Sequence, residues 1–310
     1  MLNIRAAGKL GELCVERLME MSLSQSNNNN SGALKAGLLA MLLALVPVMA
    51  FAQSTVWEWQ MSLKVENRGD AMYMPSAVAF DAASERYYAV DTGRSRLVSF
   101  SREGELLKAF TANDQLQSPF DMVRMDNGQL WVVEKGRNSL TLIDVAAQKV
   151  QPHVLHDADR LVFPDRIAKA DGQLYLLDRA GGDILRLTAD LSVEQRYGCR
   201  DCSDGFADFV IHDEDLVAIE AREKKIYRFS KQGQVREVID LSGEAGFPVS
   251  LDIGPAGFYY VLDRHANSVL VYDENGRFSY RYFASQVRFD PWGRLCVVDE
   301  GNGRIEVYGQ

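Results

Sequence analysis

The chain has 310 residues, of which 43 are acidic and 34 are lysine or arginine, giving a formal net charge of −9. This acidic balance argues against nucleic-acid binding, which relies on clustered lysine and arginine side chains. The length and the hydrophobic content of 47% suit a domain with a sizeable core.

The start of the chain has the pattern of an export signal. Lys35 precedes an apolar run over 36–52, which contains Pro47 and ends in the small residues Ala50 and Ala52. A basic residue, a short apolar segment and a small-x-small end are the parts of a cleavable signal peptide. An uncleaved membrane anchor is the alternative, but the run is shorter than the ~20 residues that span a bilayer.

We therefore expect residues 1–52 to be a signal peptide with a long N-terminal extension or a mis-assigned start, since Met19 and Met21 offer later starts. Cleavage leaves one domain over 53–310, exported to the periplasm or the cell exterior. No other apolar segment approaches the length of a membrane span, so the exported domain is expected to have no stable membrane span.

An acidic residue closes a hydrophobic strand about every 43 positions, and an aliphatic side chain follows it six residues later. The six pairs are Asp91 with Leu97, Glu134 with Leu140, Asp178 with Ile184, Glu220 with Ile226, Asp263 with Val269, and Asp299 with Ile305. A repeat of this length built from short strands predicts a β-propeller with about four strands per blade. We expect the blades at 73–116, 117–160, 161–203, 204–245, 246–284 and 285–310.

The first repeat shows the expected order of strands within a blade. Short β-rich runs cover 77–81, 86–90, 97–100 and 106–110, and polar turns separate them. Clusters of Gly, Asn, Asp or Pro recur between the first two strands of later repeats, and such clusters mark hairpins. The sequence beyond the leader shows no sustained helical periodicity.

The sixth repeat ends one strand early. It provides runs at 286–290, 294–298 and 304–308 before the chain stops at Gln310. A strand-like run within 55–66 is left over before the first blade, and we predict that it pairs as the outermost strand of the last blade. Closing the ring in this way removes open sheet edges. The predicted fold is therefore all-β, a six-bladed β-propeller of four-stranded blades closed by an N-terminal strand.

Three of the repeats share a finer pattern. The first copy combines 75–81 with 88–97, and the other two cover 248–276 and 299–308. On these segments the chain from 55 to 310 resembles the NHL-repeat family of six-bladed propellers, of the exported bacterial type.

Repeats three and four depart from the family pattern, because Glu220 replaces Asp, and Gly182 and Lys224 stand where the pattern has Asn. We interpret these two blades as degenerate copies. The resemblance implies a rigid binding or scaffolding platform that presents one face to a protein, peptide or glycan partner.

The topology of a propeller sorts its loops onto two faces. Loops between blades and loops between strands two and three share one face, which we call the loop face. The six repeating acids lie there, and we expect each carboxylate to accept backbone N–H groups and hold its turn. A catalytic array is the alternative, but all six blades need the turn and only one site would need a catalyst.

The loops of the loop face are also rich in cations. The candidate ligand- or partner-binding residues are Arg94, Arg137, Arg179, Arg222, Lys224, Lys225, Arg264 and Arg304, together with His265. On a ring these side chains would form a positive collar around the channel, suited to an acidic partner or an anionic ligand. The alternative is that each arginine pairs with its local acid.

Three carboxylates follow the blade junctions at Asp121, Asp165 and Asp208. If they converge on the channel mouth they could hold Ca²⁺, which prefers oxygen ligands. The alternative is turn chemistry at the start of each blade. No other cofactor is predicted.

Three cysteines lie beyond the leader. Cys199 and Cys202 are expected to form a disulfide in an oxidising compartment. Cys296 lies in an alternating strand pattern and is expected to be a buried free thiol. Ser203 follows the second cysteine at the place where a haem attachment motif has histidine, which argues against haem.

Propeller enzymes suggest a different function. Propeller lyases of the peptide-amidating type use His-bound zinc, and lactonase-like propellers use an acid and Asn metal site in the channel. Only His156 and His265 are expected to reach the loop face, and His153 should lie within strand four, so a three-histidine site does not assemble. The favoured function is an exported binding or scaffold protein. The alternative is a channel-site metal-dependent lyase or hydrolase that uses carboxylates and His265.

Overall fold

The computed structural model describes residues 57–112, 114–145, 147, 149–199, 202, 204–282 and 286–310. The expected signal peptide falls outside these residues and stays a prediction. In the described part of the chain no helix is long and apolar enough to cross a membrane. Helical structure there is confined to two 3₁₀ turns, η1 (Thr92–Arg94) and η2 (Glu300–Asn302).

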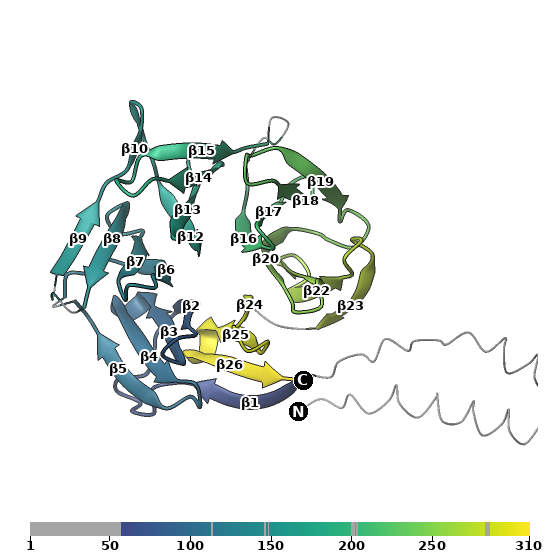
Figure 1. The fold of residues 1–310 in the computed structure, drawn as a ribbon. Coiled ribbons are helices and arrows are strands. Elements are labelled where there is room, and N and C mark those ends of the chain that lie inside the picture. The colour runs from purple at the N-terminus through teal and green to yellow at the C-terminus, as the bar shows by residue number, and fades with distance from the viewer. Residues whose placement is uncertain are drawn as a thin grey trace, which may run out of the picture. The chain divides into compact units, whose positions relative to one another are not determined.

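Six four-stranded antiparallel sheets surround a central axis, and in each the strands follow one another outward from that axis (Figure 1). Blades one to three are β2 (Pro75–Asp81), β3 (Arg86–Asp91), β4 (Arg96–Ser101) and β5 (Leu106–Phe110); β6 (Pro119–Arg124), β7 (Leu130–Glu134), β8 (Ser139–Asp144) and β9 (Lys149–His153); and β12 (Pro164–Ala170), β13 (Gln173–Asp178), β14 (Ile184–Leu187) and β15 (Val193–Tyr197). The predicted six-bladed β-propeller is confirmed.

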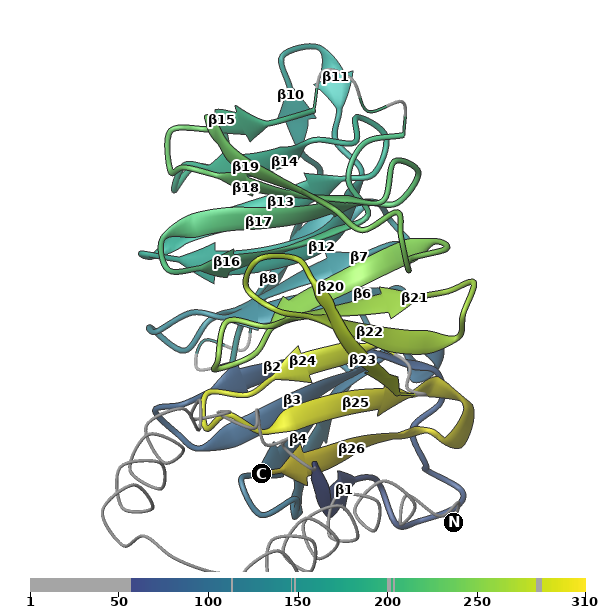
Figure 2. The same cartoon turned by 90° about the vertical axis from the view of Figure 1, so that its right-hand side faces the viewer.

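Blades four to six complete the ring. They are β16 (Asp208–His212), β17 (Asp215–Glu220), β18 (Lys225–Phe229) and β19 (Val235–Asp240); β20 (Pro248–Ile253), β21 (Tyr259–Asp263), β22 (Ser268–Tyr272) and β23 (Phe278–Tyr282); and β24 (Val287–Phe289), β25 (Leu295–Asp299), β26 (Arg304–Gly309) and β1 (Glu58–Leu63). A short hairpin of β10 (His156–Asp157) and β11 (Arg160–Leu161) lies between blades two and three, at the outer edge of the ring (Figures 1 and 2).

The N-terminal strand closes the last blade, as predicted. Strand β1 pairs antiparallel with β26, and the sheet order is β1-β26-β25-β24. The Glu306 carboxylate of β26 accepts hydrogen bonds from the Trp59 indole at 2.8 Å and from the Ser62 hydroxyl at 2.5 Å. Leu63 at the end of β1 is fully buried in a cluster that also contains Phe100 of blade one. The ends of the chain thus hold the first and last blades together.

The hydrophobic core lies between neighbouring blades. One cluster joins Val133 and Leu140 of blade two to Ile167 and Leu176 of blade three, and the other junctions have clusters of the same kind. Strand two of each blade is covered on both faces, which explains why it reads as a continuous hydrophobic run. The innermost strand of each blade differs from strand two, because its polar side chains line the axis.

The six repeating acids, Asp91, Glu134, Asp178, Glu220, Asp263 and Asp299, are called the turn carboxylates from here on. All except Asp299 are fully buried. Asp263 shows the pattern, since it accepts backbone N–H groups of Gly246, Phe247 and Ala266. Glu220 likewise accepts the N–H groups of Arg222 and Glu223. The predicted structural role of these acids is confirmed.

Candidate functional site

The register of the innermost strands defines two rings of side chains around the axis. Each residue of the first ring pairs, across to strand two of its blade, with the residue just before the turn carboxylate. The members of this ring are Ala77, Asp121, Arg166, Asp208, Ser250 and Gln286. The second ring lies two residues further along and contains Ala79, Val123, Ala168, Val210, Asp252 and Arg288. Because side chains alternate in a strand, the two members from each blade lie on the same face of their strand.

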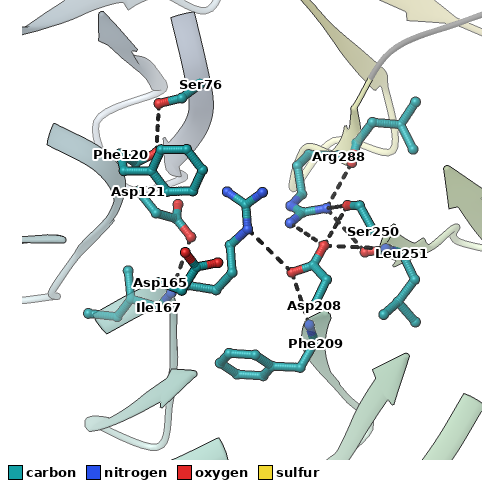
Figure 3. A network of polar contacts seen from close by, with 12 residues as sticks. Ser76, Phe120, Asp121, Asp165, Ile167, Asp208, Phe209, Ser250, Leu251 and Arg288 are labelled. Carbon is teal, nitrogen blue, oxygen red and sulfur yellow. Dashed lines mark hydrogen bonds and ion pairs between the residues drawn. The ribbon is translucent and has the colours of Figure 1, made fainter. Parts of the chain in front are cut away.

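Five charged members of these rings line one cavity and are called the channel cluster: Asp121, Arg166, Asp208, Asp252 and Arg288. Figure 3 shows Asp121, Asp208 and Arg288 of this cluster. Asp208 lies at its centre and is fully buried. It accepts the backbone N–H groups of Phe209 at 2.9 Å and Leu251 at 3.3 Å, and also the Ser250 hydroxyl. The Arg288 guanidinium donates to the same carboxylate at 2.9 Å.

Arg288 has a full set of partners. Besides Asp208, its Nη1 donates to the Ser250 hydroxyl at 3.1 Å, to the Leu251 carbonyl at 3.1 Å and to the Val287 carbonyl at 3.0 Å. Burial alone would raise the pKa of Asp208, but the charges of Arg288 and Arg166 outweigh it and hold the pKa below its ordinary value. Asp208 and Arg288 therefore form a buried ion pair that ties blade four to blade six.

Arg166 lies in the same cluster without such partners. Its Nε is 3.8 Å from Asp208 Oδ1, at the limit of an ion pair, and its Nε and Nη1 are buried with no hydrogen-bond partner. The guanidinium lies over the ring of Phe120, 4.6 Å from its centre. Only 13% of the side chain is exposed. Arg166 is thus a buried cation that is held in place by a ring and not by hydrogen bonds.

The other two acids of the cluster have raised pKa values. Asp121 accepts the N–H of Ile167 at 3.1 Å, and Asp252 accepts the N–H of Phe289 at 2.7 Å. Desolvation raises the pKa of both carboxyls, and Arg288 offsets part of this rise in each case. Perturbed carboxyls beside a specific charge partner are typical of functional sites. A carboxyl whose pKa is raised holds its proton to a higher pH than the same group in water, which suits it to proton transfer.

Two cavities meet at Arg166. The loop-face cavity has a volume of about 490 Å³, and its wall includes Ser76, Phe120, Arg166, Ser250, Arg264 and Glu300. A second cavity of about 260 Å³ opens toward the other face, and its wall includes Asp121, Arg166, Asp208, Asp252 and Arg288. The larger volume lies within the range of roughly 300–1,000 Å³ that is usual for small-molecule sites.

The predicted positive collar is only partly assembled. Several of its arginines are used locally, because Arg94 donates to the Ala71 carbonyl at 2.6 Å, Arg137 donates to the Gln115 carbonyl, and Arg304 pairs with Glu306 at 2.7 Å. The physical reason is that loop backbones near the blade junctions leave carbonyl groups that a neighbouring guanidinium can satisfy. These three arginines therefore hold the loops.

The remaining collar residues are spread around the loop face. Arg222 is 3.9 Å from Asp204, and Lys224 and Lys225 lie near Asp240, whose pKa is lowered first by Ser242 and then by these lysines. Arg179 and His265 are exposed, and the backbone of Gly246 lies against His265. Arg264 is the one predicted collar residue that lines the described loop-face cavity. Partner binding by the collar residues stays a prediction.

The three acids suggested for Ca²⁺ do not come together as a metal site. Asp121 and Asp208 reach the channel, but Asp165 pairs with Lys135 at 2.6 Å, and the Lys135 ammonium lies over Phe120. Asp208 is already neutralised by Arg288. Across the described ranges no three His, Cys, Asp or Glu side chains are grouped so that they could hold a metal ion. Arginine and lysine occupy the places where a cation would have to bind, so these residues do not fit Ca²⁺.

The cysteine predictions are confirmed. Cys199 and Cys202 form a disulfide, and Cys296 is a buried free thiol. A disulfide fits an oxidising compartment and is compatible with export.

Sequence reasoning missed Arg166, Ser250, Asp252 and Arg288. None of them carries a motif, and each lies in a strand that reads as ordinary β-structure. The signal that could have found them is the repeat itself. The six repeats can be aligned on the turn carboxylates. In that alignment the two ring positions of strand one hold small or apolar residues in some blades and charged residues in others.

The fold and the cluster together define a six-bladed β-propeller with a charged, partly open channel. Comparison with known proteins supports this class. No family model matches the chain, so membership of the NHL-repeat family is not confirmed, and no curated protein matches it in sequence.

Several solved enzyme structures share the fold. A catalytically inactive virginiamycin B lyase from Staphylococcus aureus, with quinupristin, has a TM-score of 0.61 and 16% identity over 79% of this chain and 83% of that one. A streptogramin B lyase has a TM-score of 0.61 and 14% identity over 80% and 96% of the two chains. A gluconolactonase from Xanthomonas campestris has a TM-score of 0.59 and 17% identity over 76% and 87%. At this identity the likeness shows the fold alone.

Proposed function

We propose that the protein is an enzyme whose active site is the channel, a lyase or hydrolase that acts on a small molecule or short peptide. The observation that carries the proposal is the loop-face cavity, which meets at Arg166 a second cavity lined by all five charged residues of the channel cluster. Large cavities with a few convergent polar groups and perturbed carboxyls are the usual setting of an active site. The lyases and lactonases among the structural neighbours support the same class.

Within this site Asp121 is the proposed proton carrier. It lies in the first ring beside Arg166 of the next blade, so a substrate group held at Arg166 is close to its carboxyl. Desolvation raises the pKa of Asp121, which keeps a proton on the carboxyl to a higher pH than in water. A general acid or base of this kind contributes typically 10²–10⁴-fold to a rate. Proton transfer to a leaving group, or from an attacking water, is the step that a lyase or a hydrolase requires.

The proposal departs from the metal-dependent site that the sequence suggested. Of the three suggested acids, Asp165 pairs with Lys135 and Asp208 with Arg288, and His265 is outside the wall of the loop-face cavity. No step is therefore assigned to a metal, and the proton chemistry belongs to residues of the chain itself.

The test is a proton-release assay on a panel of lactones, small esters and cyclic depsipeptides. We expect the purified protein to turn over at least one member, and Asp121→Asn to lower kcat by about 10²–10⁴-fold. Asp165→Asn is the matched control, because it removes a neighbouring carboxyl that pairs with Lys135. Its turnover should stay within a few-fold of the wild type. A rate no higher than the buffer blank across the panel, or full activity in Asp121→Asn, would overturn the proposal.

A binding platform without turnover is the second candidate, and we propose it on one observation. Arg179 and Arg264 are exposed on the loop face, and Arg264 is at the edge of the cavity, where an acidic protein, peptide or glycan could reach both. Partner capture that weakens with salt, and that Arg179→Glu with Arg264→Glu abolishes, would favour this candidate. Capture that is unchanged in the double variant would exclude it.

A further inference from the structure

The two arginines of the channel cluster differ in what they contact. Arg288 donates to one carboxylate, one hydroxyl and two backbone carbonyls. Among the described residues the one acid within ion-pair distance of Arg166 is Asp208, at 3.8 Å, and Arg288 already binds it; the Asp121 carboxyl lies near enough to feel the Arg166 charge but makes no ion pair with it. Buried donors are nearly always satisfied in folded proteins, so a buried guanidinium with two unpaired nitrogens calls for an explanation.

The surroundings of Arg166 are those of a ligand-binding site and not of a structural ion pair. Phe120 lies against the guanidinium, and both residues are part of the wall of the loop-face cavity. The second cation on that ring, Lys135, is neutralised by Asp165 at 2.6 Å. Arg166 is therefore the cation of this junction whose charge is not matched at close range. Since no hydrogen bond holds its guanidinium, a small rotation can present two N–H groups to the cavity.

We propose that Arg166 binds the carboxylate of a small organic acid, or of a peptide C-terminus, that enters the loop-face cavity carboxylate-first. This inference rests on the proposed function and names the substrate class of that site. A guanidinium forms two parallel hydrogen bonds with a carboxylate, which fixes the orientation of the bound molecule as well as its position. The rest of the molecule then extends toward Arg264 and Glu300 at the mouth.

The charges of the channel favour a carboxylate over a phosphate. Asp121, Asp208 and Asp252 all lie in the cluster around the proposed anion site, so a dianion would meet more repulsion than a monoanion. One unpaired guanidinium can balance one negative charge. A planar monoanion matches both the charge and the shape of the donor set.

Calorimetric binding to matched pairs tests the proposal. The probes are benzoic acid and benzamide, succinic acid and its monoamide, a tripeptide with a free C-terminus and the same tripeptide amidated, and inorganic phosphate. We expect at least one acid to bind ten-fold or more tightly than its amide. A preference confined to the tripeptide identifies a peptide end, and a preference for the free acids identifies small organic acids.

Two variants locate the site. Arg166→Gln should abolish the preference for acid over amide, and Arg166→Lys should lose most of it because an ammonium lacks the planar pair of donors. Arg277→Gln, which removes an exposed arginine outside the cavity wall, should keep the wild-type preference. Unfolding midpoints of the three variants are measured alongside, and they should show that each variant is fully folded under the conditions of the binding assay.

Equal binding of acids and amides, tighter binding of phosphate than of every carboxylate, or an unchanged preference in Arg166→Gln would each overturn the inference. The outcome is separable from that of the proposed function. If acids bind in a way that depends on Arg166 but no substrate is turned over, the proposed enzyme activity is wrong and the carboxylate site is supported. If turnover survives Arg166→Gln at unchanged KM, the carboxylate site is wrong and the enzyme activity is supported.

Discussion

The turn carboxylates and the channel cluster bury the same kind of side chain but give it different partners. Each turn carboxylate accepts hydrogen bonds close to its own turn, and the arrangement repeats in all six blades, as Asp263 and Glu220 show. Each charged residue of the channel cluster comes from a different blade and occurs once. Residues that repeat serve the fold, whereas charged residues that break the repeat are the ones that distinguish this propeller from others.

The largest expected effect is at the centre of the channel cluster. Asp208→Asn removes the charge that balances the buried Arg288 guanidinium, and breaking a buried ion pair in this way typically costs about 3–5 kcal/mol. We expect the urea midpoint at pH 7 to fall accordingly. The loss arises from the uncompensated arginine more than from the missing hydrogen bonds.

A double variant checks that reason. Replacing both partners, as Asp208→Leu with Arg288→Met, removes the unbalanced charge and should recover a large part of the lost stability. If the double variant is less stable than Asp208→Asn, then the hydrogen bonds to Leu251 and Ser250 matter more than the charge, and the contrast with the turn carboxylates weakens.

A smaller loss is expected at a turn carboxylate. Asp263→Ala leaves the buried N–H groups of Gly246, Phe247 and Ala266 without an acceptor, and unsatisfied groups of this kind cost about 1–3 kcal/mol. Glu220→Ala, made in a blade with a degenerate repeat, should cost a similar amount. Urea unfolding of both variants measures this. Values that differ by more than about 2 kcal/mol would show that the six turns are not equivalent.

The same contrast explains what could be predicted from the sequence. The strands, the closing strand and the role of the turn carboxylates follow from contacts within one repeat or between the two ends of the chain, and each leaves a pattern in a single blade. Asp263 and its partners, for example, lie within 20 residues of one another. The sequence alone is therefore enough to predict these features.

The channel cluster leaves no such pattern. The ion pair of Asp208 with Arg288 joins residues 80 positions apart, and only the closure of the ring brings them together. The sequence places Asp121 and Asp208 near the channel. It does not reveal which arginines balance the charge of these acids, because any surface strand can carry an arginine. The sequence therefore indicates which carboxylates lie near the channel, but not which cations balance their negative charge.

The smallest expected effect has the opposite sign. Asp121→Asn should stabilise the protein slightly at pH 7, because desolvation raises the pKa of Asp121 and ionising it in the folded state costs free energy. Below the pKa of the unfolded chain, near 4, the carboxyl is neutral in both states and imposes no cost. As the pH rises above this, the unfolded state ionises first, so Asp121 lowers stability progressively until the folded state ionises as well. The variant lacks this decline.

Urea midpoints of the wild type, Asp121→Asn and Asp208→Asn between about pH 3 and pH 8 separate the two channel acids. The pKa of Asp208 is lowered, so its contribution is present above the unfolded pKa and disappears as the pH falls through the folded value. The difference between wild type and Asp208→Asn should therefore shrink in acid, while Asp121→Asn gains on the wild type toward neutral pH. Parallel profiles for the two variants would mean that both acids are structural ion-pair partners. Asp121 would then resemble the turn carboxylates, and its role as proton carrier would lose its physical basis.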